Sequence, residues 1–199
     1  MHPEGGHVVV SPLNTDLHTD YSWVTPNLPH SGIRTVESIA SNVGILSRLG
    51  MKSSSLEERD SLASLPDDHD VWDHVANAIG NLCATLVLVL SSEKIVLGGG
   101  VMKRRCLMGK VRRRTMEILN GYVDRDSVRT MEGMESYIVR SRYGDDAGVI
   151  GGLIMASEAL KEDEKGGLGG GGKGKKIAFV AAVFAAAIAG YVVGKRKRY

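Results

Sequence analysis

Apolar residues recur at helical spacing through the middle of the chain. Between positions 71 and 86 they are Val71, Trp72, Val75, Ile79, Leu82, Cys83 and Leu86. This spacing places them on one face of a helix, which Asp67 or Asp68 is expected to cap. A similar stripe predicts a helix over 35–49 that stops at Gly50, and 54–64 is expected to form a short helix.

Short apolar runs alternate with these helices. Residues 94–97 and 137–139 are predicted to be strands, and the valine-rich 6–10 is predicted to be another. Between the first two we expect a helix with Arg112 to Arg114 facing solvent and an apolar face formed by Leu107, Val111, Met116, Ile118 and Leu119. Asp145 or Asp146 is expected to cap a last helix that ends near residue 160. The alternation predicts an α/β domain over 1–160.

The segment 11–34 has no such periodicity. Pro12, Pro26 and Pro29 lie there among Asn, Asp, Ser and Thr residues, which predicts a long loop. A loop of this length in a compact domain is either functional or poorly ordered.

The end of the chain has a different composition. Residues 161–176 form a Gly/Lys-rich linker, 177–194 carry no charge, and 195–199 form a basic tail. A helix of 18 residues spans roughly 27 Å, close to the thickness of a bilayer core. We therefore expect a single C-terminal transmembrane helix that anchors the domain to a membrane and leaves it facing the cytosol. The alternative is a buried helix, which would rarely follow a glycine linker.

Charge changes this picture little. The formal net charge is +2, so the whole molecule has no strong attraction to nucleic acid. Seven basic residues cluster within 103–114, but no helix-turn-helix or aromatic platform accompanies them, and we expect no nucleic-acid partner. Cys83 and Cys106 are too few for a disulfide framework and are interpreted as small core residues.

The predicted strand 94–97 runs directly into Gly98-Gly99-Gly100-Val101-Met102. Glycines between a strand and a helix bring bare backbone close to a ligand, and the N–H groups of the helix favour phosphate. Lys103 follows and could reach a nucleotide phosphate. Because such turns are common in α/β folds, the loop alone does not identify the ligand.

Four motifs in order make the interpretation more specific. They are 65–73, 92–102, Leu119-Asn120-Gly121-Tyr122, and Gly144-Asp145-Asp146-Ala147-Gly148 with the residues up to Leu153. This series resembles the C-terminal half of the zinc-type fructokinases of the ROK family of sugar kinases. The resemblance implies one lobe of an actin-like (ribonuclease H-like) fold that binds ATP and Mg²⁺ and phosphorylates the 6-hydroxyl of fructose or another hexose.

The first residues extend the resemblance. His2-Pro3-Glu4-Gly5-Gly6-His7 is similar to the family's sugar-binding motif, so Glu4 and His7 are expected to hold the sugar. Glu37 stands where the family has a second sugar-binding glutamate. Carboxylates can accept from two sugar hydroxyls, and imidazole can donate or accept.

The family's zinc site is expected to be lost. Its remaining counterparts are His7 and His30, and no cysteine lies between residues 8 and 82. Zinc needs about four ligands, so two histidines are too few. Without the metal, we expect the loop 11–34 to be loose.

The family's phosphate loop and general-base aspartate do not occur in this sequence, so no catalytic residue is assigned. We expect an incomplete fructokinase that needs a missing lobe, or a homodimer, as partner. One alternative is an inactive membrane-tethered protein that binds sugar or nucleotide or acts as a scaffold. Another is a nucleic-acid-binding remnant, which the membrane segment disfavours.

Overall fold

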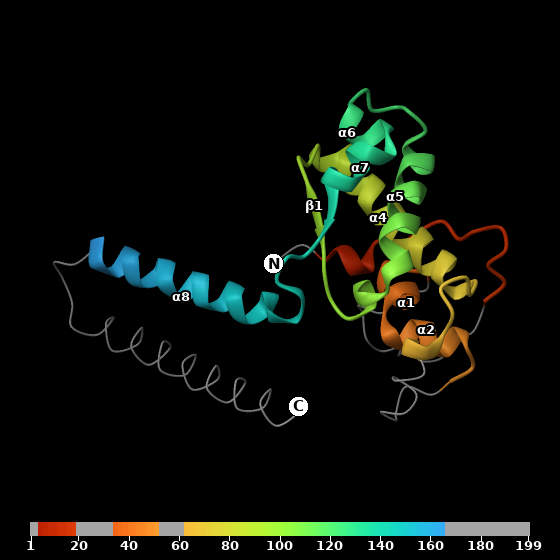
Figure 1. Ribbon diagram of the computed structural model, residues 1–199, viewed down its shortest axis with the longest axis horizontal. Coiled ribbons are helices and arrows are strands. Elements are labelled where there is room, and N and C mark those ends of the chain that lie inside the picture. Colours follow the sequence, from red (N-terminus) through yellow and green to blue (C-terminus); the bar gives the residue numbers. More distant parts are fainter. Residues whose placement is uncertain (1–3, 19–33, 52–61, 166–199) are drawn as a thin grey trace. The chain divides into compact units, whose positions relative to one another are not determined.

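The computed structural model describes residues 4–18, 34–51 and 62–165 (Figure 1). The chain divides into two compact units, Met1–Ser141 and Arg142–Tyr199. Each unit is described by itself below.

Helix α4 (Val71–Leu90) is the central element of the first unit. The apolar stripe predicted for it is confirmed, since Val75 and Cys83 are fully buried and Trp72 is 3% exposed. Its cap was predicted wrongly. The helix begins after Asp70, which makes no side-chain cap bond, and a left-handed Ser91 ends it. Burial raises the pKa of the Cys83 thiol to about 12, as expected of a core cysteine.

Helix α5 (Arg105–Leu119) packs along α4. Leu107 and Val111 are fully buried in this interface. Gly80 allows the close approach, because a Cβ there would lie 2.9 Å from Arg114 Cγ. The predicted outward orientation is wrong for Arg112 and Arg114, which are half-buried, and right for Arg113, which is exposed.

Two short parallel strands, β1 (Ile95–Leu97) and β2 (Ile138–Arg140), pair with Ile95 opposite Ile138. The chain crosses between them through η2 (Val101–Lys103), α5, α6 (Asp126–Arg129) and α7 (Met131–Tyr137). The second strand begins one residue later than predicted because Tyr137 still belongs to α7. The Tyr137 hydroxyl donates to the Ser92 carbonyl at 2.6 Å, which fastens α7 to the segment before β1.

Among the described residues, the strand predicted over 6–10 does not form. Gly5–His7 is a 3-10 turn (η1), and Val9 makes only a single bridge with Thr35. The helix predicted over 35–49 is two helices, α1 (Val36–Ala40) and α2 (Asn42–Arg48), because Ser41 is extended. The Ser41 side chain caps α2 by accepting from Gly44 N–H. A small apolar cluster that includes Val10, Val36 and Ala78 joins this region to α4.

The segment 11–18 is held more firmly than the sequence suggested. Asp16 accepts two hydrogen bonds from Arg48 of α2, at 2.7 and 2.9 Å. Both side chains are 5% exposed. The expectation of a loose loop is therefore wrong for this part, and 19–33 lies outside the described residues.

The second unit contains η3 (Gly144–Asp146) and helix α8 (Ala147–Lys165). The helix starts where predicted and continues five residues past Leu160, so 161–165 is helical rather than linker. The rest of the linker, the proposed membrane segment 177–194 and the basic tail lie outside the described residues, as does most of the short helix predicted over 54–64.

Among the described helices, α4 alone is long and apolar enough to cross a membrane by length and composition. Half of that apolar window is buried inside the protein. Its position at the centre of the core accounts for this composition.

Candidate functional site

The glycine loop lies at the carboxyl end of the two parallel strands. Gly98 approaches Ser141, whose N–H donates to the Leu97 carbonyl at 2.8 Å. Gly99 has φ +89° with open space around it, so the backbone conformation, rather than crowding, favours glycine there. The carboxyl edge of a parallel sheet is where α/β proteins commonly bind ligands.

A cavity of about 550 Å³ opens beside this loop. Part of its wall is apolar, formed by Ile45, Leu62, Trp72 and Val101. The rest is glycine backbone and polar or basic side chains, from Gly100, Lys103, Arg104, Arg105, Asp67 and Asn42. An apolar wall with a few polar groups suits a planar base, and the basic side suits phosphate.

Arg104 shapes one wall of the cavity. Its guanidinium lies 4.6 Å from the centre of the Trp72 ring, and its Nε is 3.0 Å from Asp67 Oδ1. It also donates to the Ala63 carbonyl at 3.1 Å. Arg104 therefore joins the start of α5 to the start of α4 and to the segment before it. Asp67, predicted as a helix cap, is instead an ion-pair partner.

A second cluster contains the predicted sugar-binding residues. His7 Nε2 lies 3.9 Å from Glu37 Oε2, at the start of α1. Glu4 immediately precedes η1, and its carbonyl accepts from His7 N–H at 3.1 Å. The side chains of His7 and Glu37 are 32% and 56% exposed, so the cluster is open to a ligand. The structure thus places the His7 side chain near Glu37 and the Glu4 backbone at the start of η1. That these residues hold a sugar stays a prediction.

Both clusters rest on α4. Trp72 lies in its first turn, and Gly5 packs against Leu82, where an added Cβ would lie 3.4 Å from a methyl carbon. Ten residues along a helix separate these contacts by roughly 15 Å. The two clusters are therefore attached to one rigid element.

A model of the ROK family matches residues 1–159. The chain belongs to the ROK family. Membership implies the actin-like sugar kinase fold, and the described residues form a mixed α/β structure in keeping with it.

Three curated relatives show how far the similarity extends. The chain is 30% identical over 166 residues to a putative fructokinase of Bacillus subtilis, covering 83% of this chain and 50% of that protein. It is 29% identical over 160 residues to a fructokinase of Pediococcus pentosaceus, covering 80% and 48%. It is 36% identical over 96 residues to a glucokinase of Halalkalibacterium halodurans, covering 48% of this chain and 27% of that protein. The chain spans about half the length of the fructokinases it matches.

Within this ROK chain, the predicted nucleotide residues divide into three groups. Gly100, Val101 and Lys103 line the cavity. The Met102 side chain is 4% exposed and belongs to the core instead. Gly98 and Gly99 form the turn that leads to the cavity. Sequence reasoning missed Asn42, Trp72, Arg104 and Arg105, and only their place near the glycine motif could have suggested them.

The basic run 103–114 is largely engaged inside the protein. Lys110 pairs with Asp73, and Arg112 donates to the Ile138 carbonyl. Arg114 donates to Asn77 Oδ1 at 2.8 Å. Lys103, Arg105 and Arg113 are the exposed residues of the run, and the first two line the cavity.

No group of three or more His, Cys, Asp or Glu side chains suited to a metal ion occurs among the described residues. His7 faces Glu37, and His30, the other remnant zinc ligand, lies outside them. The loss of zinc stays a prediction.

Proposed function

We propose that this chain is the sugar- and nucleotide-binding lobe of an ATP-dependent hexose kinase of the fructokinase type. The observation that carries the proposal is the pairing, on α4, of a cavity beside the glycine loop with the Glu4–His7–Glu37 cluster. The names of two matched relatives, both called fructokinases, support fructose as the sugar. Transfer to its 6-hydroxyl is part of the proposal and follows from the resemblance of the motifs.

In this proposal the apolar wall of the cavity takes the adenine base. The bare backbone at Gly99 and Gly100 lies toward the phosphates, where Lys103 adds positive charge. Mg²⁺ accompanies the nucleotide through its phosphate oxygens, because phosphoryl transfer depends on neutralising their charge.

The sugar-binding cluster supplies recognition. Carboxylates of Glu4 and Glu37 accept from sugar hydroxyls, and His7 donates or accepts between them. None of the described carboxylates is assigned as the general base. We therefore propose that turnover requires a second lobe, from another segment or chain, or a second copy. Exposed apolar side chains at Leu88, Val89, Leu90 and Val96 support such a partner.

A pair of glycine variants tests the nucleotide site. Val at Gly99 must adopt a positive φ beside the cavity, so Gly99→Val should lower ATP–Mg²⁺ affinity at least about tenfold. Gly121→Val is the matched control, because Gly121 has φ +72° in an exposed turn away from the cavity. Calorimetry that finds ATP affinity equal in Gly99→Val and the wild type would remove the loop from the site.

Turnover separates the kinase from its alternative. Fructose and glucose should each be offered with ATP–Mg²⁺, and sugar phosphate measured. Preferential phosphorylation of fructose supports the proposal. Because turnover is proposed to need a second lobe, the assay is repeated with the first half of a matched fructokinase added. Binding of both ligands without turnover, even with that half present and at concentrations that allow a second copy to associate, would favour an inactive binding or scaffold protein.

We also propose that 177–194 anchors the chain in a membrane, with the ROK domain in the cytosol. The run carries no charge, so its burial in the bilayer avoids the cost of burying charged side chains. Its basic flanks can interact with the lipid headgroups.

A further inference from the structure

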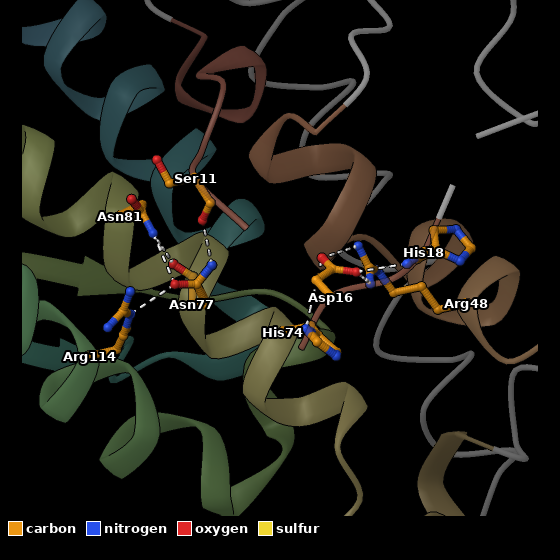
Figure 2. A network of polar contacts seen from close by, with 8 residues as sticks. All are labelled: Ser11, Asp16, His18, Arg48, His74, Asn77, Asn81 and Arg114. Carbon is orange, nitrogen blue, oxygen red and sulfur yellow. Dashed lines mark hydrogen bonds and ion pairs between the residues drawn. The ribbon is translucent and has the colours of Figure 1, made fainter. Parts of the chain in front are cut away.

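Asn77, in the middle of α4, is 2% exposed, and both its amide nitrogen and its amide oxygen form hydrogen bonds (Figure 2). Its Nδ2 donates to the Ser11 carbonyl at 2.8 Å. Its Oδ1 accepts from Arg114 Nε at 2.8 Å and from Asn81 Nδ2 at 3.2 Å. One buried side chain therefore joins a segment near the N-terminus to both long helices.

The two donors on Oδ1 decide which way the amide points. Arg114 and Asn81 can only donate from the nitrogens they present, so the acceptor oxygen must face them. This leaves Nδ2 directed at Ser11. If the amide were flipped, its Nδ2 would face the donor Arg114 Nε and its Oδ1 would face the Ser11 carbonyl oxygen. Neither pair could form a hydrogen bond, and buried polar groups would be left unsatisfied.

Ser11 follows the sugar motif in the segment 4–18. Three residues separate it from His7, and backbone hydrogen bonds tie the stretch between them to the start of α1. Val10 N–H donates to the Arg34 carbonyl at 3.0 Å, and Val36 N–H donates to the Val8 carbonyl at 3.0 Å. Glu37 is the next residue. Moving Ser11 would thus move the backbone that sets His7 opposite Glu37.

We propose that Asn77 is a positioning residue for the sugar site, acting through the Ser11 carbonyl. This inference rests on the proposed function for the identity of the ligand. Asn77 touches no predicted ligand atom, and its effect runs through the backbone of 7–11. Asp16, bonded to Arg48 farther along the segment, holds the other end independently.

Asn77→Asp is the discriminating variant because it changes one arm of the network. Asp has the same shape and still accepts from Arg114, so the contact between α4 and α5 is kept. It has no donor for Ser11 and places a carboxylate oxygen against the carbonyl oxygen. Asn120→Asp is the control: it makes the same charge change at an exposed helix end.

The full chain should be titrated with fructose and, separately, with ATP–Mg²⁺. Asn77→Asp is expected to weaken fructose binding at least about tenfold and to leave ATP binding within about twofold, since one hydrogen bond is worth about a tenfold change. Asn120→Asp should match the wild type for both ligands. Unchanged fructose affinity in Asn77→Asp, or equal loss of both ligands in a folded variant, overturns the proposal.

Amide hydrogen exchange without ligand gives a second, independent measurement. Val10 and Val36 should lose protection in Asn77→Asp while the amides of α4 and α5 keep theirs. If wild-type protein binds no fructose, the proposed function fails, and the exchange pattern still decides whether Asn77 anchors the segment. If Asn77→Asp unfolds, Asn77→Leu replaces it, because leucine is uncharged and of similar volume. Protection at Val10 and Val36 equal to that of the wild type in this variant would overturn the proposal.

Discussion

At the scale of single residues, the ion pair between Asp16 and Arg48 lies beside His74 of α4 (Figure 2). Burial by itself raises the pKa of Asp16, but the hydrogen bonds and charge of Arg48 outweigh it, and the net pKa is lowered. Burial lowers the pKa of His74 more than the attraction of Asp16, 3.9 Å away, raises it. Arg48 adds to the lowering, whereas Asp70 and Asp73 oppose it. The net pKa of His74 is therefore lowered, which favours its neutral form in the folded protein.

A stability measurement across pH tests this environment. Because the unfolded His74 accepts a proton more readily than the folded one, the free energy of unfolding should fall as pH drops below the ordinary value of 6.5. The contribution of Asp16 is lost only farther down, below 3.8. Urea unfolding of His74→Gln should show a flatter dependence than wild type just below 6.5 and a similar one near 3.8. Identical slopes in the upper range would show that His74 is not the titrating group.

At the scale of elements, α4 contacts several neighbouring segments through different faces. Trp72 stacks on Arg104, His74 lies beside Asp16, and Asn77 bonds Ser11. The periodic apolar residues predicted only the face toward the core. The polar positions between them carried no such signal. The structure shows Asn77 buried and His74 half-buried, in contact with α5 and the N-terminal segment.

Arg104 offers a test of how α4 and α5 shape the cavity. Arg104→Gln removes the contact with Trp72 and the ion pair with Asp67, so that wall should loosen. A partly desolvated cation–π contact is worth about 1–2 kcal/mol, which sets the expected loss of ATP affinity at about fivefold to thirtyfold. Arg113→Gln, an exposed arginine on the same helix, is the control. Equal ATP affinity in the two variants, measured by calorimetry, would contradict a role for Arg104 in the wall.

At the scale of the whole molecule, a ROK domain precedes a stretch with the composition of a membrane helix. The domain itself needs no membrane to explain its apolar helix, because α4 is the centre of its core. The proposed membrane attachment rests on 177–194, which makes the two parts separable by experiment.

Charge placed in this stretch tests the anchor. Ala182→Asp together with Ala186→Asp should shift the full chain from the membrane to the aqueous fraction, since each charge near a helix centre costs about 2.5–3.5 kcal/mol. Gly169→Asp with Gly171→Asp makes the same charge change in the linker and should leave the distribution as in wild type. Flotation with liposomes measures both. A wild-type chain found only in the aqueous fraction would refute the anchor.

The amino-acid sequence by itself determined the elements that depend on neighbouring residues. The 3.6-residue period of α4, the strand that runs into three glycines, and the helix after it are local patterns, and the structure confirms them. The motif order was sufficient to indicate the ROK family. The resemblance also assigned His7 and Glu37 to one sugar site, and the structure places the two side chains 3.9 Å apart.

Only the tertiary structure decided the contacts that position these elements. Asn77 and Ser11 are 66 residues apart, Arg104 and Ala63 are 41 apart, and Asp16 and Arg48 are 32 apart. A polar side chain on a helix has no local signal for its distant partner. The partner is selected when the apolar faces pack, because each buried polar group must then find a hydrogen bond within reach. Hydrophobic periodicity therefore predicted the elements that carry the candidate site, but it could not predict the contacts of the polar residues that support the site.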